Sequence, residues 1–130
     1  MTLDDALYND RYCAVHKGEL EIKWYYFPLA KSRIIRADEI RAIYFEPRHF
    51  DFATAKCWGR SLTPVWWACD FQRYISIEKD NTEHTRNVVV DVGETHMKGF
   101  TVSDIRPFLD SLMPMLNENV SVDDKFPFWK

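Results

Sequence analysis

The histidines are the first side chains to test for chemistry, because histidine serves both as a metal ligand and as a general base. There are four in the chain: His16, His49, His84 and His96. They show neither HxxxH nor HExxH spacing, and none lies beside a cysteine in a zinc-like pattern. We therefore predict no metal ion and no cofactor, and we expect each histidine to be a loop or surface residue.

Motifs for nucleophilic catalysis and for phosphate binding are also missing from the sequence. Ser61 follows Gly59-Arg60 but lacks the second glycine of a GxSxG elbow, and four glycines in all cannot form GxGxxG or a P-loop. Carboxylate pairs such as Asp4-Asp5 lie in polar end segments, where nothing need shift their pKa. The chain is thus predicted not to be an enzyme. Sequence spacing leaves open an acid–base pair built from distant strands, which would require a pocket with two convergent titratable groups.

Aromatic side chains are abundant, at 15% of residues with five tryptophans. Trp66 and Trp67 are adjacent, and neighbouring residues on a strand point to opposite faces of a sheet. One possibility is that one of the two tryptophans is exposed and marks an interaction site. The other, which we favour, is that a second layer such as the C-terminal tail covers the tryptophan that does not face the core. The residues that we assign to a partner surface are Trp58, Trp66, Trp67 and Trp129.

The charge distribution argues against a general nucleic-acid binder, because the net charge is only −3. No RNP-type motif accompanies the aromatic residues, and Trp24 falls on the apolar face of its strand, where we expect it in the core. Residues 11–60 carry ten Lys/Arg against six Asp/Glu, so this part is mildly basic. Lys31, Arg33 and Arg36 could form a basic edge that contacts anionic lipid.

The cellular compartment is predicted from cysteines and apolar runs. Cys13, Cys57 and Cys69 are odd in number and widely spaced, which is typical of reduced thiols. The first residues are acidic where a secretory signal needs basic ones, and no apolar run is long enough for a membrane span. We expect a cytoplasmic protein with no transmembrane segment.

Strands dominate the predicted elements. The pattern predicts strands over 11–16, 19–27, 31–36, 40–46, 74–78, 87–92 and 99–102, with one or two short ones between Pro47 and Ala68. Lys17-Gly18 is a tight turn. In the strand 19–27, residues Leu20, Ile22, Trp24 and Tyr26 share one face.

The pattern changes period after residue 104. A helical stripe is formed by Ile105, Phe108, Leu109, Leu112 and Leu116. Ser103 or Asp104 suits the N-cap, and Pro114 should kink or fray the last turn. We divide the chain into a polar leader (1–10), one domain (11–117) and a tail (118–130) whose aromatic residues suggest that it packs back. Composition, at 46% hydrophobic and 28% charged, is that of one globular domain.

Three stretches of the sequence are similar to the bacterial-type pleckstrin-homology-like (PH-like) family. They are Trp24-Tyr25-Tyr26-Phe27-Pro28 through Lys31–Ile35 to Glu39-Ile40, then Trp58-Gly59, and Val88–Gly93 before Gly99–Val102 and Asp104. The resemblance covers about residues 11–116. It implies a mainly β (α+β) fold, a barrel of two roughly orthogonal antiparallel sheets capped by one C-terminal helix, and no particular activity.

Phosphoinositide-binding PH domains carry a lysine in the first hairpin loop and a K/R-x-R triplet. Lys17, Lys31 and Arg33 match in type, but a strand of about 30 Å, at roughly 3.3 Å per residue, should separate Lys17 from the other two. Where that family has its triplet, this chain has Glu21 and Lys23. The leading prediction is a non-enzymatic module that binds a protein or associates with itself. Binding of anionic lipid and an unrecognised enzyme activity are the alternatives.

Overall fold

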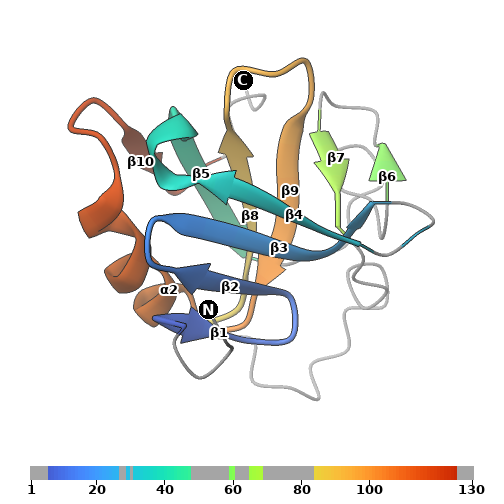
Figure 1. Cartoon of the computed structure of the whole chain (residues 1–130), viewed down its shortest axis with the longest axis horizontal. Coiled ribbons are helices and arrows are strands. Elements are labelled where there is room, and N and C mark those ends of the chain that lie inside the picture. Colours follow the sequence, from blue (N-terminus) through green and yellow to red (C-terminus); the bar gives the residue numbers. More distant parts are fainter. Residues whose placement is uncertain are drawn as a thin grey trace.

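The computed structural model describes residues 6–26, 29, 31–47, 59–60, 65–68 and 84–125. Within these ranges the chain folds into two β-sheets and one α-helix close to the C-terminal end (Figure 1). The predicted mainly β fold with one C-terminal helix is therefore confirmed. The strand predicted over residues 74–78 lies outside the described residues.

The first sheet is antiparallel throughout, with the strand order β1-β2-β3-β4. Its strands are β1 (Tyr8–Asn9), β2 (Cys13–His16), β3 (Glu19–Tyr26) and β4 (Lys31–Arg36). The turn Lys17-Gly18 joins β2 to β3, and Gly18 takes a positive φ of 80°, which glycine adopts without steric cost. β1 lies within the segment predicted to be a polar leader, so the sheet begins earlier than the sequence indicates.

The second sheet is mixed, with the strand order β10-β5-β8-β9-β7-β6. Its strands are β5 (Ala42–Pro47), β6 (Gly59–Arg60), β7 (Val65–Trp67), β8 (Arg86–Asp91), β9 (Met97–Val102) and β10 (Ser121–Asp123). β10 pairs with β5 in parallel, and so does β7 with β9. The expectation of two antiparallel sheets is thus wrong for this one. β10 also brings part of the predicted tail into the domain.

The two sheets do not form a closed barrel in the part of the chain that the structure describes, because no ladder joins β4 to the second sheet. A 3-10 turn, Ala37–Glu39, leads the chain from the edge of one sheet into the other. The strands β3 and β4 cross β8 and β9 steeply, as Figure 1 shows. Of the expected barrel, two layers of crossing strands are present, and the side chains between them form the main core.

The strand β3 contains a β-bulge that the sequence pattern does not reveal. Its register with β4 shifts between Ile22 and Tyr26, and Trp24 has a φ of 55°. The extra residue reverses the alternation, so that Tyr25 is buried and Trp24 is 53% exposed. The prediction that Trp24 belongs to the core is therefore wrong.

The helix α2 (Ile105–Leu112) covers the strands β1 and β2. The carboxylate of Asp104 accepts a hydrogen bond from the backbone N–H of Arg106, which confirms Asp104 as the N-cap. The predicted stripe faces the core, with Ile105, Phe108 and Leu112 buried. The α-helix ends before Pro114, and the chain continues as the 3-10 turn Met113–Met115.

Buried side chains form two clusters, one on each face of the second sheet. The main cluster fills the space between the sheets and α2 and includes Ile22, Ile43 and Phe100. The smaller cluster on the opposite face consists of Val65, Trp67 and Val89, with Tyr44 and Met97 packed against it. Burial on both faces explains why β8 is a nearly continuous run of valines instead of an alternating strand.

Candidate functional site

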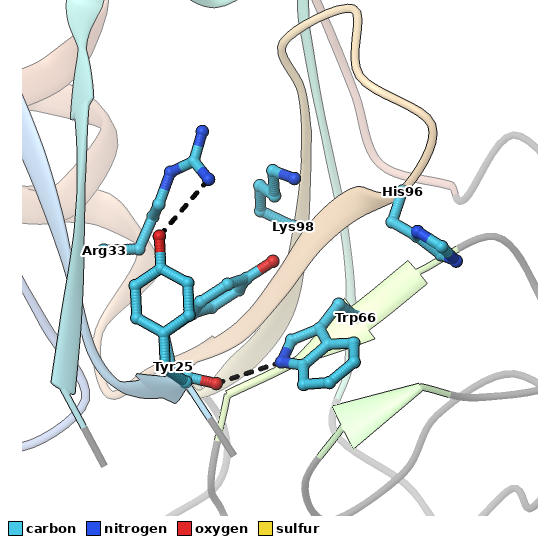
Figure 2. A pocket seen from close by; sticks show the side chains of 6 residues that line it. Tyr25, Arg33, Trp66, His96 and Lys98 are labelled. Atoms are coloured by element: carbon cyan, nitrogen blue, oxygen red, sulfur yellow. Dashed lines mark hydrogen bonds between the residues drawn. The ribbon is translucent and has the colours of Figure 1, made fainter. Parts of the chain in front are cut away.

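A pocket of about 240 Å³ opens where β3 and β4 of the first sheet approach β7 and β9 of the second. Its lining is aromatic and cationic. The lining residues are Tyr25, Tyr26, Arg33, Trp66, His96 and Lys98. Figure 2 shows Arg33 on one side of the pocket, His96 and Trp66 on the other, and Lys98 between them.

The bulge at Trp24 supplies the aromatic wall. Because it turns Tyr25 inward, the carbonyl oxygen of Tyr25 accepts a hydrogen bond of 3.0 Å from the indole N–H of Trp66 (Figure 2). The ring centroids of these two residues lie 6.4 Å apart, and Tyr26 packs edge-on against Tyr25 at 5.1 Å. Burial raises the pKa of Tyr25 above its ordinary value, so this phenol stays protonated.

Arg33 enters the pocket from the edge strand β4. It shares its face with the buried Ile35, and its side chain is only 23% exposed. Its guanidinium donates to Glu94 Oε2 at 2.9 Å and to the hydroxyl of Tyr26 at 3.4 Å. Burial alone would lower the pKa of Arg33, but its hydrogen bonds to Glu94 and Tyr26 and the charge of Glu94 together outweigh burial and raise that pKa.

Lys98 enters from the central strand β9 and is the most buried cation of the pocket. Its side chain is 6% exposed, and its Nζ lies 2.6 Å from Glu94 Oε1. The hydrogen bonds from Lys98 and then Arg33 lower the pKa of Glu94, which therefore stays ionised. One carboxylate thus holds two cations from different sheets.

The sequence does carry a signal for Lys98, although the predicted strand 99–102 begins one residue after it. Its partner in the ladder is Val90, and it alternates with Phe100 and Val102, which are fully buried. A lysine on the inward face of a strand needs a counter-ion, because an unpaired buried charge is strongly unfavourable. No comparable local signal identifies Glu94, which lies in the exposed turn between β8 and β9.

The adjacent tryptophans lie on opposite faces of β7, as predicted. Trp66 is half-buried at the pocket, whereas Trp67 is fully buried in the smaller cluster, so a second layer does cover it. A Cβ on Gly99 would lie only 2.5 Å from the indole of Trp67, which packs directly on that glycine. Trp67 is therefore not available to a partner, and its assignment to a partner surface is wrong.

The other sites expected from the sequence are dispersed. Trp58 and Trp129 lie outside the described residues. Lys31 and Arg36 are exposed, but Arg36 is on the opposite face of β4 from Arg33 and pairs with Asp38. The ladder places Glu19 opposite Arg36 and Tyr26 opposite Lys31, which confirms that Lys17 and Lys31 lie at opposite ends of β3.

The histidines differ in their surroundings. His16 is on β2 and is buried, contrary to expectation, with its Nε2 2.9 Å from Glu21 Oε1. His84 is exposed, as predicted, and His96 lies half-buried at the pocket. His49 is not among the described residues. Across the ranges that the structure describes, no three His, Cys, Asp or Glu side chains form a group that could hold a metal ion.

Two further findings concern the general class of protein. No helix in the described ranges is both long and apolar enough to cross a bilayer. Comparisons with protein-family models, curated proteins and solved structures find no match to this chain. The resemblance to PH-like domains therefore stays a prediction, and function has to be argued from the pocket.

Proposed function

We propose that this chain is a non-enzymatic binding module of PH-like architecture, and that its pocket anchors one side chain of a partner protein. The observation that carries the proposal is the composition of the pocket, which Tyr25, Tyr26 and Trp66 line together with two cations. Tyrosine, tryptophan and arginine are the residues most enriched at the energetic centres of protein interfaces.

The size of the pocket supports the same proposal. Its volume of about 240 Å³ is below the range of roughly 300–1,000 Å³ that is typical of small-molecule and cofactor sites. A single amino-acid side chain fits such a volume. Tyr26 is 39% exposed at the pocket, so this part of the lining is accessible to a partner.

Enzyme activity is the alternative with a specific observation in its favour, because Arg33, His96 and Lys98 converge on one pocket. The ion pairs argue for binding instead. Glu94 pairs with two of these groups, and each of its two oxygens is held by a cation. A carboxylate in this state is a poor general base, since its lowered pKa weakens it as a proton acceptor.

Site-specific photo-crosslinking in cells tests the proposal. Tyr26 is replaced by p-benzoylphenylalanine, and so, as a matched control, is Met113, which is 47% exposed at the end of α2. Tyr26 is the last residue of β3, whereas the turn at the other end of that strand contacts Met115, next to α2, through the backbone N–H of Gly18. We expect a discrete adduct from position 26 and none from position 113. An adduct of twice the chain mass identifies self-association, and a different mass identifies another partner. Equal labelling at both positions, or none, would contradict the proposal.

A further inference from the structure

The cations of the pocket are fixed more firmly than the carboxylate that pairs with them. Arg33 and Lys98 are in strands, with side chains 23% and 6% exposed, whereas the side chain of Glu94 is 49% exposed. Glu94 belongs to the turn between β8 and β9, in which Gly93 has a φ of 83° and Thr95 is also exposed. Glu94 can therefore withdraw into solvent by a movement of the turn, whereas the backbone of Arg33 and Lys98 is fixed in ladders and their side chains are largely enclosed.

A withdrawn Glu94 would leave a buried ammonium and a largely buried guanidinium without a counter-ion. That state is strongly unfavourable unless another anion takes the vacated position. The position itself is well defined, because one oxygen of Glu94 lies 2.6 Å from Lys98 Nζ and the other 2.9 Å from the guanidinium of Arg33. A second planar carboxylate would make the same two contacts.

We infer that Glu94 is an internal stand-in for the ligand, and that the pocket recognises the carboxylate of an acidic side chain on the partner protein. The inference rests on the proposed function and specifies its ligand. The partner's carboxylate displaces Glu94 and binds Arg33 and Lys98. Its methylene groups pack on the rings of Tyr25 and Trp66, which form the apolar wall.

The arrangement of charges favours a protein side chain over a membrane surface. A lipid bilayer would have to engage several basic residues on one face, but Arg36 lies on the face of β4 opposite Arg33. The pocket also holds its two cations between aromatic rings, where a buried side chain can reach them. Lipid headgroups and free phosphate are therefore treated as competing outcomes of the test.

The test is a titration of the wild-type chain and the Glu94→Ala variant with N-acetylglutamate α-amide, which carries a single side-chain carboxylate. NMR signals of the Trp66 indole N–H and the Lys98 amide report binding, at constant ionic strength. If Glu94 occupies the site about nine-tenths of the time, its removal should tighten binding by about tenfold. Glu118→Ala, which removes an exposed carboxylate elsewhere, should leave the affinity unchanged.

Several results would overturn the inference. They are equal affinity in wild type and Glu94→Ala, the same shifts with chloride alone, and tighter binding of inorganic phosphate or phosphatidylserine vesicles than of the carboxylate. Arg33→Gln keeps the test decisive if Glu94→Ala unfolds, because this variant should lose at least tenfold of the wild-type affinity. As a second measurement, acetate should raise the Tm of Glu94→Ala more than that of wild type, because it binds the variant more tightly.

The two proposals fail separately. Carboxylate binding without an adduct from position 26 would refute the protein-binding function but would still support a carboxylate site at Arg33 and Lys98. An adduct from position 26 with no gain in carboxylate affinity on removal of Glu94 would support the protein-binding function. It would refute the inference that Glu94 occupies the position of the ligand carboxylate.

Discussion

Glu21 shows how much of the first sheet one residue can hold together. It lies on β3, and its carboxylate is bonded by His16 Nε2 from β2 at 2.9 Å and by the hydroxyl of Ser32 from β4 at 2.8 Å. Burial by itself would raise the pKa of Glu21, but the hydrogen bonds from His16 and Ser32 and the electrostatic attraction of His16 and Lys23 together outweigh burial and lower it. The ionised carboxylate therefore stabilises the folded chain.

The Glu21→Gln variant should show that the contribution of Glu21 to the unfolding free energy depends on pH. The folded pKa lies below the unfolded value of about 4.3, so the stabilisation is complete above that value and disappears as the pH falls through the folded pKa. At pH 7 we expect the variant to lose about 1.5–3 kcal/mol of unfolding free energy, the typical contribution of a hydrogen bond to a charged group. Urea denaturation between pH 7 and pH 3 measures the difference, which should narrow in acid.

Glu19→Gln is the matched control, because Glu19 is an exposed carboxylate on the same strand. It should change stability by less than about 0.5 kcal/mol, as surface substitutions generally do. A difference between wild type and Glu21→Gln that stays constant across the pH range would show that ionisation of Glu21 is not the cause.

At the scale of elements, the bulge in β3 decides which aromatic residues reach the pocket. Trp24 takes a left-handed backbone conformation, which costs a residue with a Cβ about 1–2 kcal/mol. The shift sends Tyr25 inward and Trp24 outward. Strained residues cluster at functional sites, and this bulge lies directly beside the residues that we propose for binding.

Substitutions at position 24 test the backbone conformation. Trp24→Gly should be more stable than Trp24→Ala by about 1 kcal/mol, because glycine adopts a positive φ without steric cost. Trp24→Asn should fall between them. Thermal and urea unfolding of the three variants measure the order of their stabilities. Alanine at least as stable as glycine would mean that the strand is regular in solution.

At the scale of the molecule, the second sheet pairs its first strand in chain order, β5, with its last, β10. β10 pairs in parallel with β5 at its edge, whereas β8 lies in the interior between β5 and β9. The residues Val88, Val89 and Val90 of β8 are completely buried. The stability of the fold is therefore expected to be greatest at β8 and lowest at the edge strands.

Native-state hydrogen exchange measures this gradient. The amides of Val88–Val90 should exchange only through global unfolding, whereas those of Ser121–Asp123 should exchange faster, by local opening at the edge. Increasing urea should raise the exchange rates of Val88–Val90 steeply and those of Ser121–Asp123 only weakly. Equal protection of the two groups would mean that β10 is as integral to the fold as β8.

Local patterns in the sequence were sufficient to predict most of the helices and strands. The stripe Ile105 to Leu116 predicted a helix, Ser103 or Asp104 its N-cap and Pro114 a kinked or frayed last turn, because helical contacts join residues three and four apart. The period of two in 19–27 likewise predicted β3. These properties depend on neighbours in the sequence, so the sequence by itself determined them.

The tertiary structure alone decided the site. The bulge at Trp24 reverses an alternation that appears regular in the sequence, and it depends on the pairing of β3 with β4. Arg33 and Glu94 are 61 residues apart, and only the crossing of the two sheets brings them to 2.9 Å. The spacing of charged residues in the sequence does not predict such an ion pair, because the energy of the pair depends on burial and on distances set by the whole fold.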